Sequence, residues 1–126
     1  MRIIPTRVHG ILDYLVGLIL IVSPWVLGFS HVEHHAAVWL PVVLGVGALL
    51  YSLMTAYELG LLALIPMPAH LGLDIGSGVL LVASPWLFGF SHEVYWPHLI
   101  FGLLEIGAGL MTQTTPRHVN APAVAA

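Results

Sequence analysis

Four long apolar segments, separated by short polar stretches, organise this chain. A membrane-spanning helix needs about 20 largely apolar residues, and the segments at roughly residues 8–29, 39–57, 69–90 and 97–114 approach that length. The fourth segment is the shortest. Because lipid offers no partner to a free backbone amide or carbonyl group, each segment is expected to be helical. The pattern therefore predicts an all-α integral membrane protein, a four-helix bundle in contact with the lipid bilayer.

The second half of the chain repeats the first. VSPWVLGFSH at residues 22–31 returns as ASPWLFGFSH at residues 83–92, an offset of 61 residues. A sequence that recurs in this way indicates one structural unit used twice. The same offset pairs Ile4 with Ile65, Pro5 with Pro66, His9 with His70, Asp13 with Asp74 and Gly17 with Gly78.

Beyond the repeated stretch, four extra loop residues in the first half change the offset to 57. This offset pairs Trp39 with Trp96, Gly45 with Gly102 and Thr55 with Thr112. We therefore predict two-helix repeats at residues 1–57 and 69–114, a connector at 58–68 and a disordered tail at 115–126. Because both repeats cross the membrane in the same direction, they should be related by a pseudo-twofold axis along the membrane normal.

The tandem stretches VSPWVLGF and ASPWLFGF resemble the SPW repeat family of small bacterial membrane proteins. The resemblance covers nearly the whole chain, up to about Gln113. It implies two SPW units, each with two membrane spans, in the inner membrane of a bacterium. It implies no biochemical activity.

The Ser-Pro-Trp motif is expected to end a helix and anchor it at the membrane surface. A proline removes one backbone donor and frees the carbonyl group four residues earlier, and the preceding serine can hydrogen-bond freed backbone. Gly28 and Gly89 can then take the left-handed conformation that turns the chain into a loop. A direct role of the motif in ligand binding is the alternative. The motif residues are Ser23, Pro24, Trp25, Ser84, Pro85 and Trp86.

Charges and tryptophans both predict the orientation in the membrane. The basic residues Arg2, Arg7 and Arg117 lie near the two chain ends, so both termini are expected in the cytoplasm. The four tryptophans flank the two outer loops, where amphipathic rings prefer the headgroup layer. The connector would then lie on the inner side, and its first part is expected to form a short interfacial helix.

Composition narrows the possible functions. The chain is 59% hydrophobic and only 7% charged, which no soluble domain of 126 residues could accommodate. A net charge of -3 gives no indication of a nucleic-acid partner, and the absence of cysteine excludes disulfides and thiolate chemistry. Asp13 interrupts the first apolar run and no cleavage pattern follows it, so the first 28 residues are not expected to be a signal peptide.

Histidine and aspartate recur together inside two predicted spans. HGILD runs from His9 to Asp13 and HLGLD from His70 to Asp74, and the i,i+4 spacing places each pair on one helix face. The aspartates would lie about two turns inside the helix, on the order of 12 Å. Ionisable groups at that depth cost at least a few kcal/mol and normally face a bundle interior, a partner or a water-filled cavity. Glu105, whose counterpart is Ala48, is expected near the middle of the fourth span.

Several interpretations of this polar set remain open. The pairs can simply lock helix packing through hydrogen bonds. They can also bind a divalent metal such as zinc, iron or manganese, or relay protons or ions together with Glu105. A histidine pair can ligate a haem, although that signal is weak. The candidate residues are His9, Asp13, His70, Asp74 and Glu105.

A second, weaker histidine set lies in the predicted outer loops, close to Glu33 and Glu93. Such residues can bind a metal weakly, sense pH near the ordinary histidine pKa of about 6.5, or simply be solvated. His98 differs from the others because it enters the fourth span. The members of this set are His31, His34, His35, His92 and His98.

No catalytic signature appears in the sequence: the patterns of serine hydrolases, nucleotide-binding loops and HExxH metalloproteases are missing. The leading functional hypothesis is therefore a non-enzymatic membrane protein, an accessory or scaffold subunit of a larger complex or a homo-oligomer. The rival hypothesis is an ion or proton pathway or a metal-binding protein that uses the histidine and aspartate pairs. An enzyme ranks third.

Overall fold

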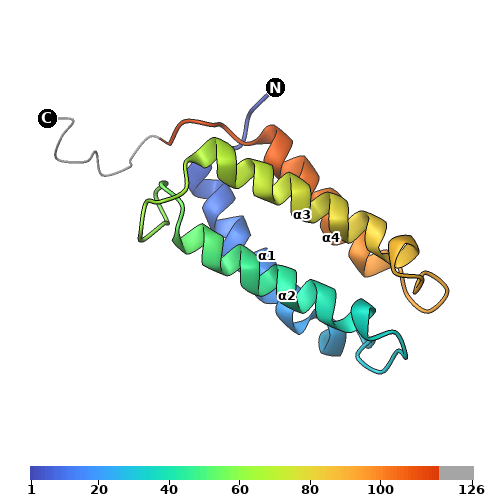
Figure 1. Ribbon diagram of the computed structural model, residues 1–126. Helices are drawn as coiled ribbons and strands as arrows, with labels where there is room; N and C mark the ends of the chain where they lie inside the picture. The colour runs from blue at the N-terminus through green and yellow to red at the C-terminus, as the bar shows by residue number, and fades with distance from the viewer. Residues whose placement is uncertain (117–126) are drawn as a thin grey trace, which may run out of the picture.

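Prolines set where two of the helices begin. In the computed structural model, which describes residues 1–116, α1 follows Pro5 and α3 follows Pro66, and both prolines have extended backbone. A third proline, Pro68, lies in the first turn of α3, where its missing N–H is not needed. The helices are α1 (Thr6–Val26), α2 (His35–Leu53), α3 (Met67–Leu87) and α4 (Trp96–Met111) (Figure 1).

The all-α prediction is confirmed. The described residues contain these four helices and no strand, only two isolated bridges, Ile4 with Thr112 and Thr55 with Ile65. The predicted disordered tail at 115–126 falls outside the described residues from Arg117 onward.

Three helices are long and apolar enough to cross a membrane: α1 with 21 residues, α2 with 19 and α3 with 21. Helix α4 is also apolar but has only 16 residues. The burial pattern also fits lipid, because leucines and valines cover the outside while polar side chains such as Thr55, His70 and Thr112 are fully buried. The chain is an all-α membrane protein with three candidate spans, and a crossing by α4 stays a prediction.

Glycines set the packing within two helix pairs, α1 with α2 and α3 with α4. A Cβ atom added to Gly45 would lie 2.6 Å from the carbonyl oxygen of Gly17, and one added to Gly102 would lie 2.6 Å from that of Gly78. Both distances are shorter than any real contact of this kind. The two backbones can therefore approach closely only because these positions carry no side chain.

The connector departs from its prediction. No helix forms between residues 54 and 66, so the expected interfacial helix in the first part of 58–68 is wrong. Instead the chain folds back on the end of α2. The amides of Leu61 and Leu62 donate to the carbonyl oxygen of Leu53, and those of Leu64 and Ile65 donate to that of Met54. These hydrogen bonds satisfy the open carbonyl groups at the end of α2. If the connector formed an independent helix, those carbonyl groups would stay unpaired.

The two Ser-Pro-Trp motifs accommodate a proline inside the last turn of each helix by the same hydrogen bonds, and the helices end two residues later, at Val26 and Leu87. Pro24 cannot donate to the carbonyl oxygen of Leu20, and the Ser23 hydroxyl donates to that oxygen at 2.8 Å. In the second motif the Ser84 hydroxyl donates to the carbonyl oxygen of Leu81 at 2.7 Å. Serine thus replaces the donor that proline removes.

After each motif the chain turns at a glycine. Gly28 has φ of 80° and Gly89 has φ of 79°, the left-handed conformation in which a side chain is strained. Trp25 and Trp86 are 56% and 58% exposed, so both rings are available to a membrane surface. The two loops lie at one end of the bundle, and the connector and the N-terminus lie at the other (Figure 1).

A double-mutant cycle can test whether the Ser23 hydroxyl takes over from the N–H that Pro24 lacks. Ser23→Ala leaves the buried Leu20 carbonyl without a partner, and we expect a loss of about 1–3 kcal/mol in the free energy of unfolding in detergent. Adding Pro24→Leu returns an amide donor and should recover part of the loss. Equal stability of the single variant and the wild type would contradict this account.

Candidate functional site

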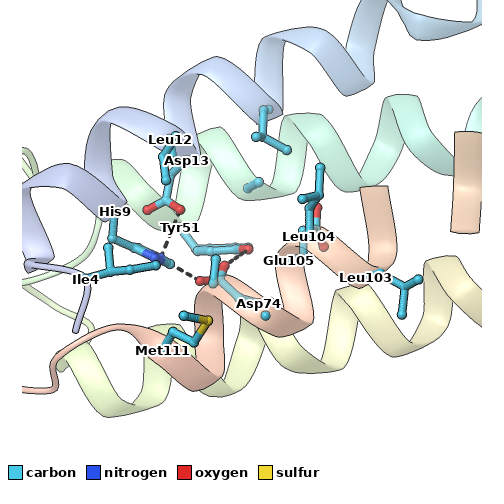
Figure 2. Close-up of a pocket in the computed structure, with 15 residues that line it drawn as sticks. Ile4, His9, Leu12, Asp13, Tyr51, Asp74, Leu103, Leu104, Glu105 and Met111 are labelled. Carbon is cyan, nitrogen blue, oxygen red and sulfur yellow. Dashed lines mark hydrogen bonds and ion pairs between the residues drawn. The ribbon is translucent and has the colours of Figure 1, made fainter. Parts of the chain in front are cut away.

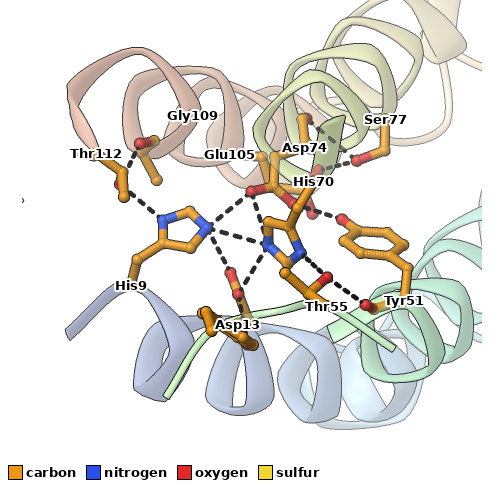
Figure 3. A network of polar contacts seen from close by, with 12 residues as sticks. His9, Asp13, Tyr51, Thr55, His70, Asp74, Ser77, Glu105, Gly109 and Thr112 are labelled. Carbon is orange, nitrogen blue, oxygen red and sulfur yellow. Dashed lines mark hydrogen bonds and ion pairs between the residues drawn. The ribbon is translucent and has the colours of Figure 1, made fainter. Parts of the chain in front are cut away.

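Two helices bring the repeated histidines and aspartates together. Helix α1 supplies His9 and Asp13, α3 supplies His70 and Asp74, and the four side chains meet between the helices (Figure 3). His9 Nε2 lies 3.0 Å from Asp13 Oδ1 and 2.8 Å from Asp74 Oδ2. His70 Nε2 lies 3.0 Å from Asp13 Oδ2 and 3.4 Å from Asp74 Oδ2. Each aspartate therefore contacts both histidines.

Two threonines fix which ring nitrogen of each histidine carries a proton. The Thr55 hydroxyl donates to the carbonyl oxygen of Tyr51 at 2.6 Å, so its oxygen can only accept from His70 Nδ1, 2.7 Å away. Likewise the Thr112 hydroxyl donates to the carbonyl oxygen of Ala108, and its oxygen accepts from His9 Nδ1 at 2.8 Å. Both Nδ1 atoms are therefore N–H donors, and both Nε2 atoms point toward the centre.

Each hydrogen bond between a histidine and a threonine joins one half of the chain to the other. His9 of the first half binds Thr112 of the second, while His70 of the second binds Thr55 of the first. The two bridges follow the same rule, because Ile4 pairs with Thr112 and Ile65 with Thr55. The centre is thus built jointly by both halves.

The two Nε2 atoms and the carboxylate oxygens that they face require additional positive charge between them. The two Nε2 atoms lie 3.3 Å apart and face carboxylate oxygens, which accept hydrogen bonds and cannot donate them when ionised. Extra protons or a cation must therefore occupy the region between these atoms. A divalent ion would balance the two carboxylates while both imidazoles stay neutral, which keeps the buried group uncharged overall.

The spacing of the donor atoms also suits a small ion. One ligand atom from each of His9, Asp13, His70 and Asp74 can be chosen so that all lie within 4.8 Å of one another. A tetrahedral ion with bonds of about 2.0–2.1 Å holds its ligand atoms about 3.3 Å apart. The distance of 3.3 Å between the two Nε2 atoms equals that spacing, and the contacts of 2.8–3.4 Å between nitrogen and oxygen atoms would need to lengthen slightly on average around an ion.

Two tyrosines complete the outer layer. The Tyr51 hydroxyl donates to Asp74 Oδ1 at 2.5 Å, and the Tyr57 hydroxyl donates to Asp13 Oδ2 at 3.1 Å. The rings of both tyrosines also contact the His70 ring, with centroids 5.0 and 5.4 Å apart. No pattern in the sequence indicated these tyrosines, whereas the threonines are visible as a pair in the repeat alignment.

Glu105 lies beside the two histidine–aspartate pairs and not among them. The Ser77 hydroxyl donates to Glu105 Oε2 at 2.7 Å. Within the described residues, no hydrogen bond joins the Glu105 carboxyl group to the histidines or aspartates. Instead Glu105 lines a cavity of about 350 Å³ that His9, Asp13 and Asp74 also line (Figure 2).

The outer histidines separate into different environments. His34 Nδ1 donates to Glu93 Oε1 at 3.1 Å, and His92 Nε2 lies 3.9 Å from the same oxygen. The hydrogen bond from the His34 ring holds the pKa of Glu93 below its ordinary value. The described part of the chain brings neither His31 nor His35 into this group, and both are exposed at the loop.

His98 does not share that group either. Its side chain is buried, and Nε2 donates to the carbonyl oxygen of Ala37 at 2.8 Å. The ring contacts Phe29 and Phe90, with centroids 5.4 and 4.9 Å away. His98 therefore ties α4 to the start of α2 and to the residues that follow both Ser-Pro-Trp motifs.

A family comparison agrees with this architecture. The sequence model described as the SPW repeat domain matches residues 7–112. The chain belongs to the SPW repeat family. The matched region takes in both histidine–aspartate pairs, both threonines and both Ser-Pro-Trp motifs of this SPW protein. Searches of curated proteins and of solved structures returned no match.

Proposed function

We propose that this SPW protein binds a divalent metal ion inside the membrane through His9, Asp13, His70 and Asp74. The observation that carries the proposal is the convergence of two Nε2 atoms and two carboxylates, with both Nδ1 protons already directed outward to threonines. Outer-shell partners that hold a histidine in this tautomer are typical of metal sites.

Zinc suits the centre best. Four nitrogen and oxygen ligands at near-tetrahedral spacing are typical of Zn²⁺, whereas manganese and iron usually add further oxygen ligands. A haem fits poorly, because the Asp13 and Asp74 carboxylates flank the two Nε2 atoms where the macrocycle would lie. A proton pathway is also less well supported, since among the described residues Glu105 is linked to the four ligands only through the Ser77 hydroxyl and the backbone carbonyl oxygen of Asp74, and not through a ligand side chain.

The alternative role as an accessory or scaffold subunit stays a prediction. An accessory or scaffold role requires a partner protein. A metal centre is compatible with such a role, because an ion that ties α1 to α3 would also stabilise the bundle on which a partner docks.

We also propose that all four helices cross the inner membrane of a bacterium, with both termini in the cytoplasm and two tandem two-helix units. At one end, the Arg2 guanidinium donates to the carbonyl oxygens of Gly109 and Thr112, so basic charge caps the end of α4. At the other end the exposed tryptophans gather, with Trp25 and Trp39 6.3 Å apart between ring centroids. Basic groups on one side and aromatic rings on the other support this orientation.

Metal content tests the proposed function directly. Protein purified in detergent without chelators should carry about one zinc ion per chain by elemental analysis. Asp13→Asn and Asp74→Asn should each weaken zinc affinity by more than about 100-fold, because loss of a ligand exceeds the 10–100-fold effect of an outer partner. Glu105→Gln is the matched control and should retain zinc. A folded wild-type protein that binds none of zinc, manganese or iron would contradict the proposal.

The threonines offer a second, subtler test. Thr55→Val and Thr112→Val keep the side-chain shape but remove the acceptor for Nδ1–H, so each should weaken zinc affinity about 10–100-fold. Ser77→Ala removes a hydroxyl that bonds Glu105 and should leave the affinity unchanged. Titration of each metal-free variant with zinc measures its affinity. Equal zinc affinity of the two threonine variants and Ser77→Ala would refute the argument that the threonines hold the histidine tautomers.

Cysteine labelling tests the orientation, and the natural absence of cysteine makes single-cysteine variants unambiguous. In intact cells, a membrane-impermeant maleimide should label Glu33→Cys in the first loop. The same reagent should label Thr114→Cys, next to α4, only after the membrane is opened. Labelling of both variants in intact cells would place residue 114 on the outer side of the membrane and would contradict the proposed orientation.

A further inference from the structure

The cavity beside the four ligands opens on the side of the bundle where α1 and α4 face each other. Its lining residues come mainly from these two helices (Figure 2). At its rim, Leu12, Leu103, Leu104 and Met111 are 38%, 54%, 56% and 40% exposed. In a membrane such side chains face acyl chains, so a molecule dissolved in the bilayer can enter without crossing water.

The cavity exists because the two halves differ there. By the offset of 57, Leu50 and Tyr51 of α2 correspond to Gly107 and Ala108 of α4. On the α2 and α3 side, the Tyr51 ring packs against His70 with centroids 5.0 Å apart. On the α1 and α4 side, the small residues Gly107 and Ala108 line open space next to His9. The repeat keeps the metal ligands and the glycine contacts, and it diverges at the cavity wall.

The third divergent position adds a carboxyl group to the cavity. Glu105 replaces the alanine found at residue 48, and among the described residues neither arginine nor lysine lines the cavity. Ser77 engages Oε2, and Oε1 has no hydrogen-bond partner among the described residues. A charged partner would bring a further ion into a low-dielectric region at high cost, whereas a neutral hydroxyl can pair with a carboxyl group in either protonation state.

We infer that this cavity binds a membrane-dissolved molecule with an apolar body and a neutral hydroxyl group, an alcohol or a phenol, held by a hydrogen bond to Glu105. The volume of about 350 Å³ lies within the range of small-molecule sites. The inference goes beyond the metal centre and does not require the ion, because Glu105, Gly107 and Ala108, on which it depends, are not metal ligands.

Photolabelling tests the inference. The protein in phosphatidylcholine nanodiscs is exposed to a long-chain alcohol that carries a diazirine on its chain, and labelled residues are mapped by mass spectrometry. We expect labels on α1 and α4 around the cavity, displaced by unlabelled alcohol. Glu105→Ala should reduce labelling about tenfold, as loss of one buried hydrogen bond to a carboxyl group predicts. Glu105→Gln still accepts a hydrogen bond and should retain most of it.

Filling the cavity gives an independent variant. Gly107→Leu combined with Ala108→Tyr restores the residues of the first half and should also abolish labelling. Leu110→Phe, on the lipid-facing side of the same helix, adds bulk outside the cavity and should have no effect. Zinc content and thermal unfolding of every variant establish that each is folded, so a failed metal centre and a failed cavity site are distinguished.

Chemically altered probes decide the ligand class. A methyl ether of the same chain cannot donate a hydrogen bond and should label weakly, and a primary amine should label less than the alcohol. Labelling by the ether equal to that by the alcohol, stronger labelling by the amine, or labelling unaffected by both cavity variants would overturn the inference.

Discussion

The contact between two histidine–aspartate pairs across the bundle axis is the constraint on which this structure depends. Four ionisable side chains lie deep in an apolar helix bundle, where each alone would be costly. They are tolerated because every one of them faces another, with nitrogen to oxygen distances of 2.8–3.4 Å. Helices α1 and α3 must therefore stay in register, and the threonines and tyrosines of the neighbouring segments hold the group together.

The remaining architecture brings these pairs to one point. Glycine contacts draw α1 onto α2 and α3 onto α4, and the exchanged bonds to Thr55 and Thr112 join the two pairs of helices. The serine in each Ser-Pro-Trp motif lets a helix include proline in its last turn without a buried carbonyl left unpaired. Packing in lipid gains little from hydrophobic burial, so such close backbone contacts and hydrogen bonds carry most of the specificity.

The residues that the two halves share and the residues at which they differ occupy different parts of the structure. Residues that repeat, such as His9 with His70 or Gly45 with Gly102, occupy the centre and the helix contacts. Residues that differ, above all Glu105 and Ala108 against Ala48 and Tyr51, line the cavity. The repeated residues thus build a shared centre between the two halves of the chain, while the residues that differ between the halves leave room for the cavity on one flank.

The sequence alone determined the helices, the family and the serine–proline turns, because these depend on apolar length and on local backbone bonds. It also placed histidine and aspartate on one face of each helix, since an i,i+4 spacing is a local property. Only the tertiary structure decided that the two faces meet, that Tyr51 and Tyr57 reach the aspartates and that His98 serves packing. It also decided that the connector folds back on α2 in place of forming a helix. These features depend on side chains far apart in the chain, and no local pattern encodes the distance between them.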